Sequence, residues 1–186
     1  MAGDLLDGLR RGDAAAYREA VRVHGPALYS FLLRLAGRKE VADDLFQETW
    51  LALARHATRL RADTRLEAWL FTVARNAHRS HRRWRWADLS RWLVDEDVEA
   101  VATTPSPEDA AARSQEARAV ETALATLRPA EREVLLLAAQ DGLSAAEAAV
   151  MLGVAPEAYR QRLHRARSAL TAALDRLLRS SSWRSP

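Results

Sequence analysis

The sequence predicts an all-α protein, with two small helical domains joined by a flexible acidic linker. Three observations support this prediction. First, the 186 residues are rich in alanine and leucine and include only 7 glycines and 6 prolines. Second, apolar residues recur mostly at spacings of three and four, which is the period of one helix face, and no segment alternates as a strand does. Third, the composition changes abruptly near the middle of the chain, and the length suits two small domains.

Composition excludes several classes of protein. There is no cysteine, which excludes disulfides, thiolate catalysis and cysteine–zinc sites. No apolar run approaches the ~20 residues that a membrane span needs, and the N-terminus lacks the pattern of a signal peptide. We therefore expect a cytoplasmic protein without membrane insertion. Carboxylate pairs, nucleophile–base pairs and phosphate loops are not visible, so we expect no catalytic residue, no metal and no cofactor.

The first predicted domain covers residues 1–93 and contains four helices. Asp13 is a suitable N-cap for the first helix. Pro26 suits the first turn of a second helix, where its missing N–H is not needed. Apolar spacing then predicts the third and fourth helices at residues 41–56 and from residue 66 to beyond residue 83.

Residues 94–112 form the predicted linker. They read VDEDVEAVATTPSPEDAAA, with six acidic residues, two prolines and no basic residue. Such a segment has too little apolar material for a core, and its like charges favour an extended tether. Helical spacing resumes in the second predicted domain, residues 113–178, and residues 179–186 are predicted to be a disordered tail.

The second domain contains a predicted helix-turn-helix. Ser144 and Glu147 form the S-x-x-E pattern of a capping box, which satisfies orphan donors at a helix start. Gly153 provides a positive φ that ends this helix, and Pro156 opens the next one. Two helices joined by such a turn place the second helix in the major groove of DNA.

The second helix of this motif has an apolar and a polar side. Tyr159, Leu163, Ala166 and Leu170 are predicted to face inward. The remaining side chains carry donors and acceptors that suit guanine and adenine edges, and they are Arg160, Gln161, Arg162, His164 and Arg165. A plain helical hairpin with a solvated basic face is the alternative interpretation.

The third predicted helix carries an acidic and polar stripe. Asp43, Asp44, Gln47, Glu48 and Leu51 recur at spacings of three and four, and they would share one face. DNA would be repelled by this face, whereas a basic protein surface would not. A protein-docking face and a solvated helix face are both compatible with the pattern.

The fourth predicted helix carries the opposite charge. Its stretch ARNAHRSHRRWRW, residues 74–86, contains no acidic residue. Several polar residues lie off the apolar stripe and would suit a phosphate backbone, namely Arg75, Asn76, Arg79, Arg82 and Arg83. Trp69 is expected in the core, whereas Trp84 and Trp86 either pack within the fold or stack on bases.

These segments together resemble the sigma-70 family of transcription initiation factors. DDLFQETWLAL, followed by EAWLFTVARN, is similar to the second conserved region of that family. ALATLRPAEREVLLLAAQDGLSAAEAAVMLG, followed by RLHRARSAL, is similar to the fourth region. The order of the two regions and the short linker resemble the extracytoplasmic-function (ECF) group, and the resemblance covers about residues 13–174.

The resemblance implies a factor that binds core RNA polymerase, directs it to specific promoters and aids promoter melting. It assigns Asp44, Gln47, Glu48 and Leu51 of the third helix to polymerase binding, and the polar residues of the fourth helix to the minus-ten element. In the loop at residues 59–65 it adds Arg61, Asp63 and Thr64, where the family captures a flipped base. The outward residues of the helix-turn-helix would read the minus-thirty-five element. Expected partners are core RNA polymerase, promoter DNA as duplex and as melted strand, and an anti-sigma factor, which is common in the group.

The sequence also departs from the family pattern. Ser80 stands where an acidic residue is common, and Glu157, Ala158 and Tyr159 stand where Gly-Thr-Val is common. Ala155 replaces the usual serine cap, which costs about 1 kcal/mol if nothing compensates. These departures leave the minus-thirty-five preference open. The alternative functions are a stand-alone helix-turn-helix regulator, with the first half as an oligomerisation domain, and a helical adaptor that does not bind DNA.

Overall fold

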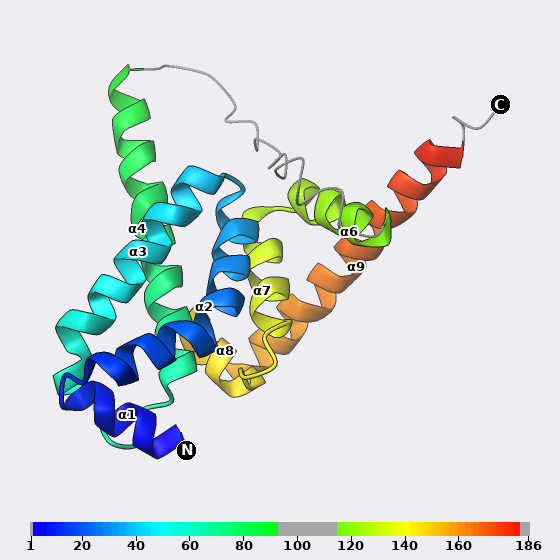
Figure 1. Ribbon diagram of the computed structural model, residues 1–186. Helices are drawn as coiled ribbons and strands as arrows, with labels where there is room; N and C mark the ends of the chain where they lie inside the picture. The colour runs from blue at the N-terminus through cyan, green and yellow to red at the C-terminus, as the bar shows by residue number, and fades with distance from the viewer. Residues whose placement is uncertain (1, 93–114, 183–186) are drawn as a thin grey trace. The chain divides into compact units, whose positions relative to one another are not determined.

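The computed structural model describes residues 2–92 and 115–182, and every regular element in these ranges is a helix (Figure 1). The all-α prediction is therefore confirmed. The chain divides into two compact units, residues 1–99 and residues 100–186, and each unit builds its own core. The predicted linker, residues 94–112, lies outside the described residues, so its proposed bounds stay a prediction.

The first unit contains α1 (Ala2–Arg10), α2 (Ala14–Ala36), α3 (Lys39–His56), a short 3-10 turn (Ala57–Arg59) and α4 (Leu66–Trp92). Helices α2, α3 and α4 pack against one another around the core. The side chains of Phe31 on α2 and Phe71 on α4 are fully buried and meet edge to face, with ring centroids 5.1 Å apart. The packing of the three helices around this core holds the exposed faces of α3 and α4 in fixed positions.

Helix α1 was not among the predicted elements. Its Leu6 and Leu9 are buried and extend the core of the unit. Gly8 allows the close approach of α1 to α2, because a Cβ at this position would lie only 2.6 Å from the Cβ of Ala16. The predicted cap at the start of α2 is confirmed, since the Asp13 carboxylate accepts a hydrogen bond from the backbone N–H of Ala15 at 2.8 Å.

Helix α2 continues through Pro26, so the predicted helix boundary at this residue is wrong. A proline inside a helix removes one backbone hydrogen bond and disfavours helical geometry in the preceding residue, partly through that residue's Cβ. The preceding residue here is Gly25, which has no Cβ. Burial of Ala20 before the proline and of Leu28 and Phe31 after it offsets the lost hydrogen bond.

The second unit contains α6 (Gln115–Thr126), α7 (Pro129–Ala138), α8 (Ala145–Leu152) and α9 (Pro156–Ser182). The predicted capping box begins α8: the Glu147 N–H donates to Ser144 Oγ at 3.2 Å, and the Ser144 N–H donates to a Glu147 carboxylate oxygen at 2.8 Å. Gly153, at φ 65°, ends α8 in the left-handed region. The predicted helix-turn-helix is thus formed by α8 and α9.

Helix α9 is longer than a recognition helix needs to be. It continues to Ser182, so the prediction of a disordered tail from residue 179 is wrong for residues 179–182. Its C-terminal half packs against α6, where Ala173 meets the buried Ala123 and Leu127. Burial of apolar side chains in this packing favours continuation of the helix. The polar composition of the tail alone does not indicate it.

Candidate polymerase-binding and DNA-binding surfaces

The predicted stripe on α3 forms one exposed face. Asp44, Gln47 and Glu48 are all exposed, and Leu51, one turn further on, keeps 49% of its surface in solvent. The other side of α3 carries buried residues, among them Leu45 and Leu53. The structure therefore brings together all four predicted polymerase-binding residues, as an acidic and polar face with one exposed leucine.

Asp43 belongs to the predicted stripe, but its carboxylate is engaged by side chains of the first unit. Its carboxylate accepts hydrogen bonds from the Tyr29 hydroxyl at 2.6 Å and from the Lys39 ammonium at 2.8 Å. The hydrogen bond from Lys39 first, and then the one from Tyr29, lower the pKa of Asp43. Asp43 therefore helps to join α2 to α3.

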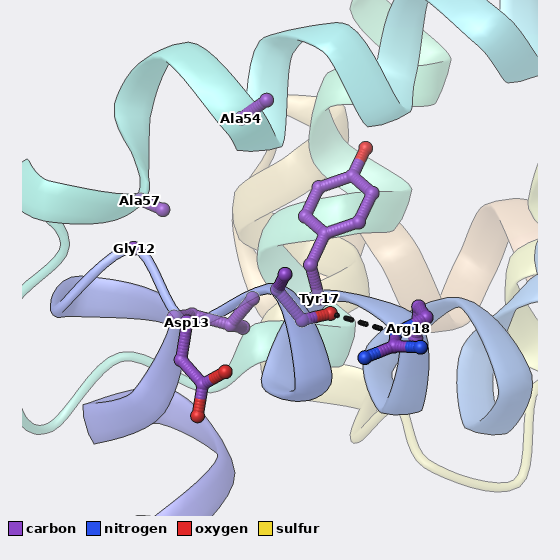
Figure 2. A pocket seen from close by; sticks show the side chains of 8 residues that line it. Gly12, Asp13, Tyr17, Arg18, Ala54 and Ala57 are labelled. Carbon is purple, nitrogen blue, oxygen red and sulfur yellow. Dashed lines mark hydrogen bonds between the residues drawn. The ribbon is translucent and has the colours of Figure 1, made fainter.

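A surface hollow lies beside the C-terminal end of α3 (Figure 2). The Tyr17 ring lies between α2 and α3 in Figure 2, with its hydroxyl directed toward α3. Asp13 and Arg18 add charges, and the Arg18 Nε donates to the Ala14 carbonyl at 3.3 Å. The complete lining is Leu9, Gly12, Asp13, Ala14, Tyr17, Arg18, Ala54 and Ala57. Because Ala54 belongs to α3, this mostly apolar hollow adjoins the helix that carries the acidic face.

Helix α4 separates a buried stripe from a basic surface. Its Leu70, Phe71, Ala74 and Ala77 are buried. Four of the five predicted polar residues are exposed, namely Asn76, Arg79, Arg82 and Arg83. Figure 1 shows the C-terminal turns of α4, in green, extending past α3. The segregation of polar from apolar side chains on this helix therefore holds for these four residues.

Arg75 is an exception, because its side chain is only 5% exposed. It follows Phe71 by four residues and Ala74 by one, and α4 packs against both α2 and α3, so the buried side of the helix is wide. The prediction that Arg75 belongs to the exposed basic surface is wrong. His78 on the same helix is also buried, at 7% exposure.

The aromatic residues of α4 differ in environment. Trp69 is half-buried, as a residue at the edge of the core would be. Trp84 is 67% exposed, next to the exposed Arg82 and Arg83. The side chain of Trp86 lies outside the described residues. The interpretation that Trp84 packs within the fold is therefore wrong.

The predicted minus-ten loop is a compact turn. Arg61 and Asp63 form an exposed ion pair, with Nε to Oδ1 at 3.0 Å. This hydrogen bond from Arg61 is the main reason that the pKa of Asp63 is lowered. The Thr64 N–H donates to the Arg61 carbonyl at 3.0 Å, and the Thr64 side chain is half-buried. The three residues therefore share one turn that precedes α4.

The N-terminal half of α9 presents a polar face. Tyr159 and Ala166 are buried on one side of the helix. On the opposite side, a shallow hollow is lined by Glu157, Arg160, Gln161, His164 and Arg165. Four of the five predicted minus-thirty-five residues therefore lie together, whereas Arg162 is exposed but does not line this hollow.

Glu157 is a member of this face that the sequence interpretation treated only as a departure from the family. Its Oε2 accepts hydrogen bonds from the Nε and Nη2 of Arg160, at 2.9 Å and 2.6 Å. The signal was available in the sequence, because opposite charges three residues apart on a helix are within reach of each other.

Within the described ranges, no group of histidine and carboxylate side chains is placed to hold a metal ion. Across the same residues, no helix combines the length and the apolar character that a membrane crossing requires.

Comparison with known families agrees with the division into two units. Residues 20–87 match the model of Sigma-70 region 2, and residues 117–170 match that of Sigma-70, region 4. The first match contains α3, the loop after it and most of α4, and the second contains α8 and the N-terminal half of α9. Both charged faces of the first unit and the polar face of α9 thus lie within the matched segments.

Characterised relatives are similar along most of their length. The RNA polymerase sigma factor CarQ of Myxococcus xanthus is 31% identical over 163 residues, which cover 86% of this chain and 90% of the relative. The ECF RNA polymerase sigma factor EcfG of Rhodopseudomonas palustris is 33% identical over 157 residues, 84% of each chain.

Solved structures lead to the same group. The sigma factor RpoE of Bartonella quintana, solved in complex with the anti-sigma factor NepR, has a TM-score of 0.71 and 27% identity, covering 86% of this chain and 96% of that one. CnrH, solved with the cytosolic domain of CnrY, has a TM-score of 0.67 and 30% identity, covering 93% and 96%. The chain belongs to the ECF group of the sigma-70 family of RNA polymerase sigma factors.

Proposed function

We propose that this protein is a transcription initiation factor that binds core RNA polymerase, directs it to specific promoters and aids promoter melting. The observation that carries the proposal is the pair of oppositely charged faces on α3 and α4, within the segment that matches Sigma-70 region 2. One face suits a protein and its neighbour suits DNA. The protein acts by binding and positioning and carries out no catalysis of its own.

The acidic face of α3 is the proposed contact with polymerase. Asp44 and Glu48 supply negative charge, Gln47 adds hydrogen-bonding groups, and Leu51 supplies an apolar contact. An exposed leucine framed by polar residues is typical of the centre of a protein interface, because its burial on binding is favourable. The same carboxylates repel phosphates, which keeps DNA away from this side of the unit.

The basic surface of α4 and the turn before it are the proposed minus-ten contact. Arg79, Arg82 and Arg83 neutralise phosphates along the melted strand. Trp84 offers an exposed ring on which an unpaired base can stack. Arg61, Asp63 and Thr64 lie in the turn before α4, where a flipped base would be held. Unstacking a base costs a few kcal/mol, and these contacts offset that cost.

The second unit is proposed to hold the minus-thirty-five duplex through the outward face of α9. Two modest DNA contacts that are tied through polymerase reinforce each other, because the second contact becomes intramolecular. The protein works in the cytoplasm, where it meets polymerase and DNA. By analogy with RpoE and its complex with NepR, an anti-sigma factor is a further proposed partner.

Polymerase binding is the direct test of the proposal. The variant Gln47→Ala/Glu48→Arg should bind core RNA polymerase at least about tenfold more weakly, because it removes a hydrogen-bonding side chain and reverses one charge. Asp7→Arg is the matched control, since it raises the net charge by the same two units at an exposed site on α1. Affinity of the double variant equal to that of wild type would contradict the assignment of α3.

A stand-alone helix-turn-helix regulator is the other function that the second unit could serve, but the comparisons do not favour it. Such a regulator would dimerise and shift a palindromic duplex unaided. The proposed initiation factor should instead bind core polymerase as a monomer and select promoters only in that complex. Promoter binding should also weaken steeply with salt, because phosphate contacts release counterions.

A further inference from the structure

The ion pair between Glu157 and Arg160 has a specific geometry. Nε and Nη2 of Arg160 both donate to the same carboxylate oxygen, Oε2 of Glu157. The two residues lie one turn apart at the start of α9, and the side chains of Glu157 and Arg160 are 64% and 66% exposed. They line the shallow hollow on the outward face of the helix, together with Gln161, His164 and Arg165.

The pair leaves one edge of the guanidinium available. Arginine has five N–H donors, and Glu157 engages one on Nε and one on Nη2. The remaining donors lie on Nη1 and on the far side of Nη2, which form the end of the planar fork. Two parallel donors at this spacing match the O6 and N7 acceptors of guanine in the major groove. An arginine held by its side edge is thus oriented for a two-point contact through its end edge.

The position on α9 agrees with this use. Tyr159 and Ala166 anchor the opposite side of the helix in the core of the second unit, so the Glu157–Arg160 side faces solvent. Gly153 and Pro156 fix where the helix begins. In a helix-turn-helix, it is the N-terminal residues of the second helix that meet base edges.

We propose that Glu157 is a specificity-determining positioning residue that acts through Arg160. It holds the guanidinium by one edge and directs the other edge to a guanine of the upstream promoter duplex. This inference rests on the proposed function, in which α9 reads that duplex.

The energetics separate positioning from folding. Exposed ion pairs of this kind contribute little to stability, so loss of Glu157 should leave the second unit folded. DNA binding removes water from the pair and strengthens it. The Glu157 carboxylate also opposes nearby phosphates. Its removal should therefore raise affinity for DNA in general while lowering discrimination between bases, a combination that simple destabilisation does not produce.

The test uses the full-length chain bound to core RNA polymerase, and promoter fragments whose upstream duplex is randomised. Wild type, Glu157→Ala, Glu157→Gln and Arg160→Ala are compared by sequencing the bound fraction. Asp175→Ala is the control, because it removes the same charge from an exposed site on α9 about 27 Å further along the helix. Thermal melting of each variant checks that the fold is retained.

Wild type should prefer guanine at one upstream position by roughly tenfold or more. Glu157→Ala should lower this preference to about threefold or less, with equal or higher affinity for unselected DNA, and Glu157→Gln should fall between. Arg160→Ala should abolish the preference, and adding Glu157→Ala to it should cause no further change in base preference. Asp175→Ala should match wild type.

Two results would overturn the inference, and they are distinguishable. If wild type selects an upstream sequence and Glu157→Ala selects it equally well, Glu157 does not position Arg160, but the proposed function stands. If the wild-type complex selects no upstream sequence, or does not form, the proposed function fails together with the inference.

Discussion

Tyr17 donates a hydrogen bond from its hydroxyl to the backbone carbonyl of Trp50 at 2.7 Å, and the two rings meet edge to face with centroids 6.0 Å apart. This contact joins α2 to α3 across 33 residues of sequence. Trp50 in turn meets Phe46, which meets Tyr29. A row of aromatic side chains therefore fixes α3, and with it the proposed polymerase-binding face.

Tyr17→Phe should lower the free energy of unfolding of the first unit by about 1 kcal/mol, because it removes one partly buried hydrogen bond and keeps the ring. Urea denaturation followed by circular dichroism measures the change. Tyr17→Ala should cost more, since the ring contact with Trp50 is lost as well. A midpoint for Tyr17→Phe equal to that of wild type would show that the hydroxyl contributes nothing.

His24 predicts a pH dependence. Partial burial lowers its pKa, and the nearby Glu67 carboxylate opposes this effect. Because the folded state disfavours the charged form, stability is full above the unfolded pKa, near 6.5, and is lost as the pH falls through the folded value. The stability of wild type relative to His24→Gln should thus decrease between pH 7.5 and pH 5.

The measurement is a series of urea denaturations of both proteins across that range. Adding Glu67→Gln to wild type should enlarge the pH dependence, because it removes the charge that opposes desolvation. A wild-type minus His24→Gln difference that is flat with pH, or that grows as the pH falls, would contradict the assignment.

The arginines of α4 should separate into two classes. Arg75→Ala should destabilise the first unit by about 2 kcal/mol or more, because a side chain that is 5% exposed loses its place in the packed structure. Arg79→Ala/Arg82→Ala/Arg83→Ala should melt at nearly the wild-type temperature and bind core polymerase normally, yet form fewer open complexes. Permanganate footprinting of unpaired thymines reports the opening, and normal footprints with the triple variant would exclude the proposed phosphate contacts.

Trp84 should contribute to binding of the melted strand without contributing to stability. Trp84→Ala should weaken binding of the polymerase complex to a fork with a single-stranded minus-ten segment by ~1–3 kcal/mol, the worth of one stacked base. Its melting temperature should not change, since the ring is 67% exposed. Trp84→Phe should recover much of the affinity because a ring remains, and if Phe and Ala bind equally poorly, stacking is not the reason.

Many of these helices and caps could be predicted from the sequence, because local signals and burial agree. Ser144, Glu147 and Gly153 mark the ends of α8 by chemistry that acts within a few residues. The exposed stripe of α3 follows from helical spacing alone, since only one side of that helix meets the core.

The errors arise where tertiary contacts override local signals. Pro26 ordinarily marks a helix start, but Gly25 and the buried residues around them keep α2 continuous. Arg75 carries a charge that argues for exposure, but contacts of α4 with two helices widen its buried side. Helix α1 depends on the close approach at Gly8, which no pattern within residues 2–10 reveals.

The geometry of α4 has a consequence for how this family member can vary. One continuous helix carries both the buried Phe71 and the exposed Arg82. The rotation of the packed turns about the helix axis therefore sets the direction of every side chain in the outer segment, residues 79–84. Replacing an outer residue changes one contact and leaves its neighbours in place. Deleting or inserting one residue between Ala77 and Arg79 would instead swing the whole outer segment by about 100° around the helix axis. Evolution can therefore retune this segment by point substitution, whereas a change of length would misdirect all of it at once.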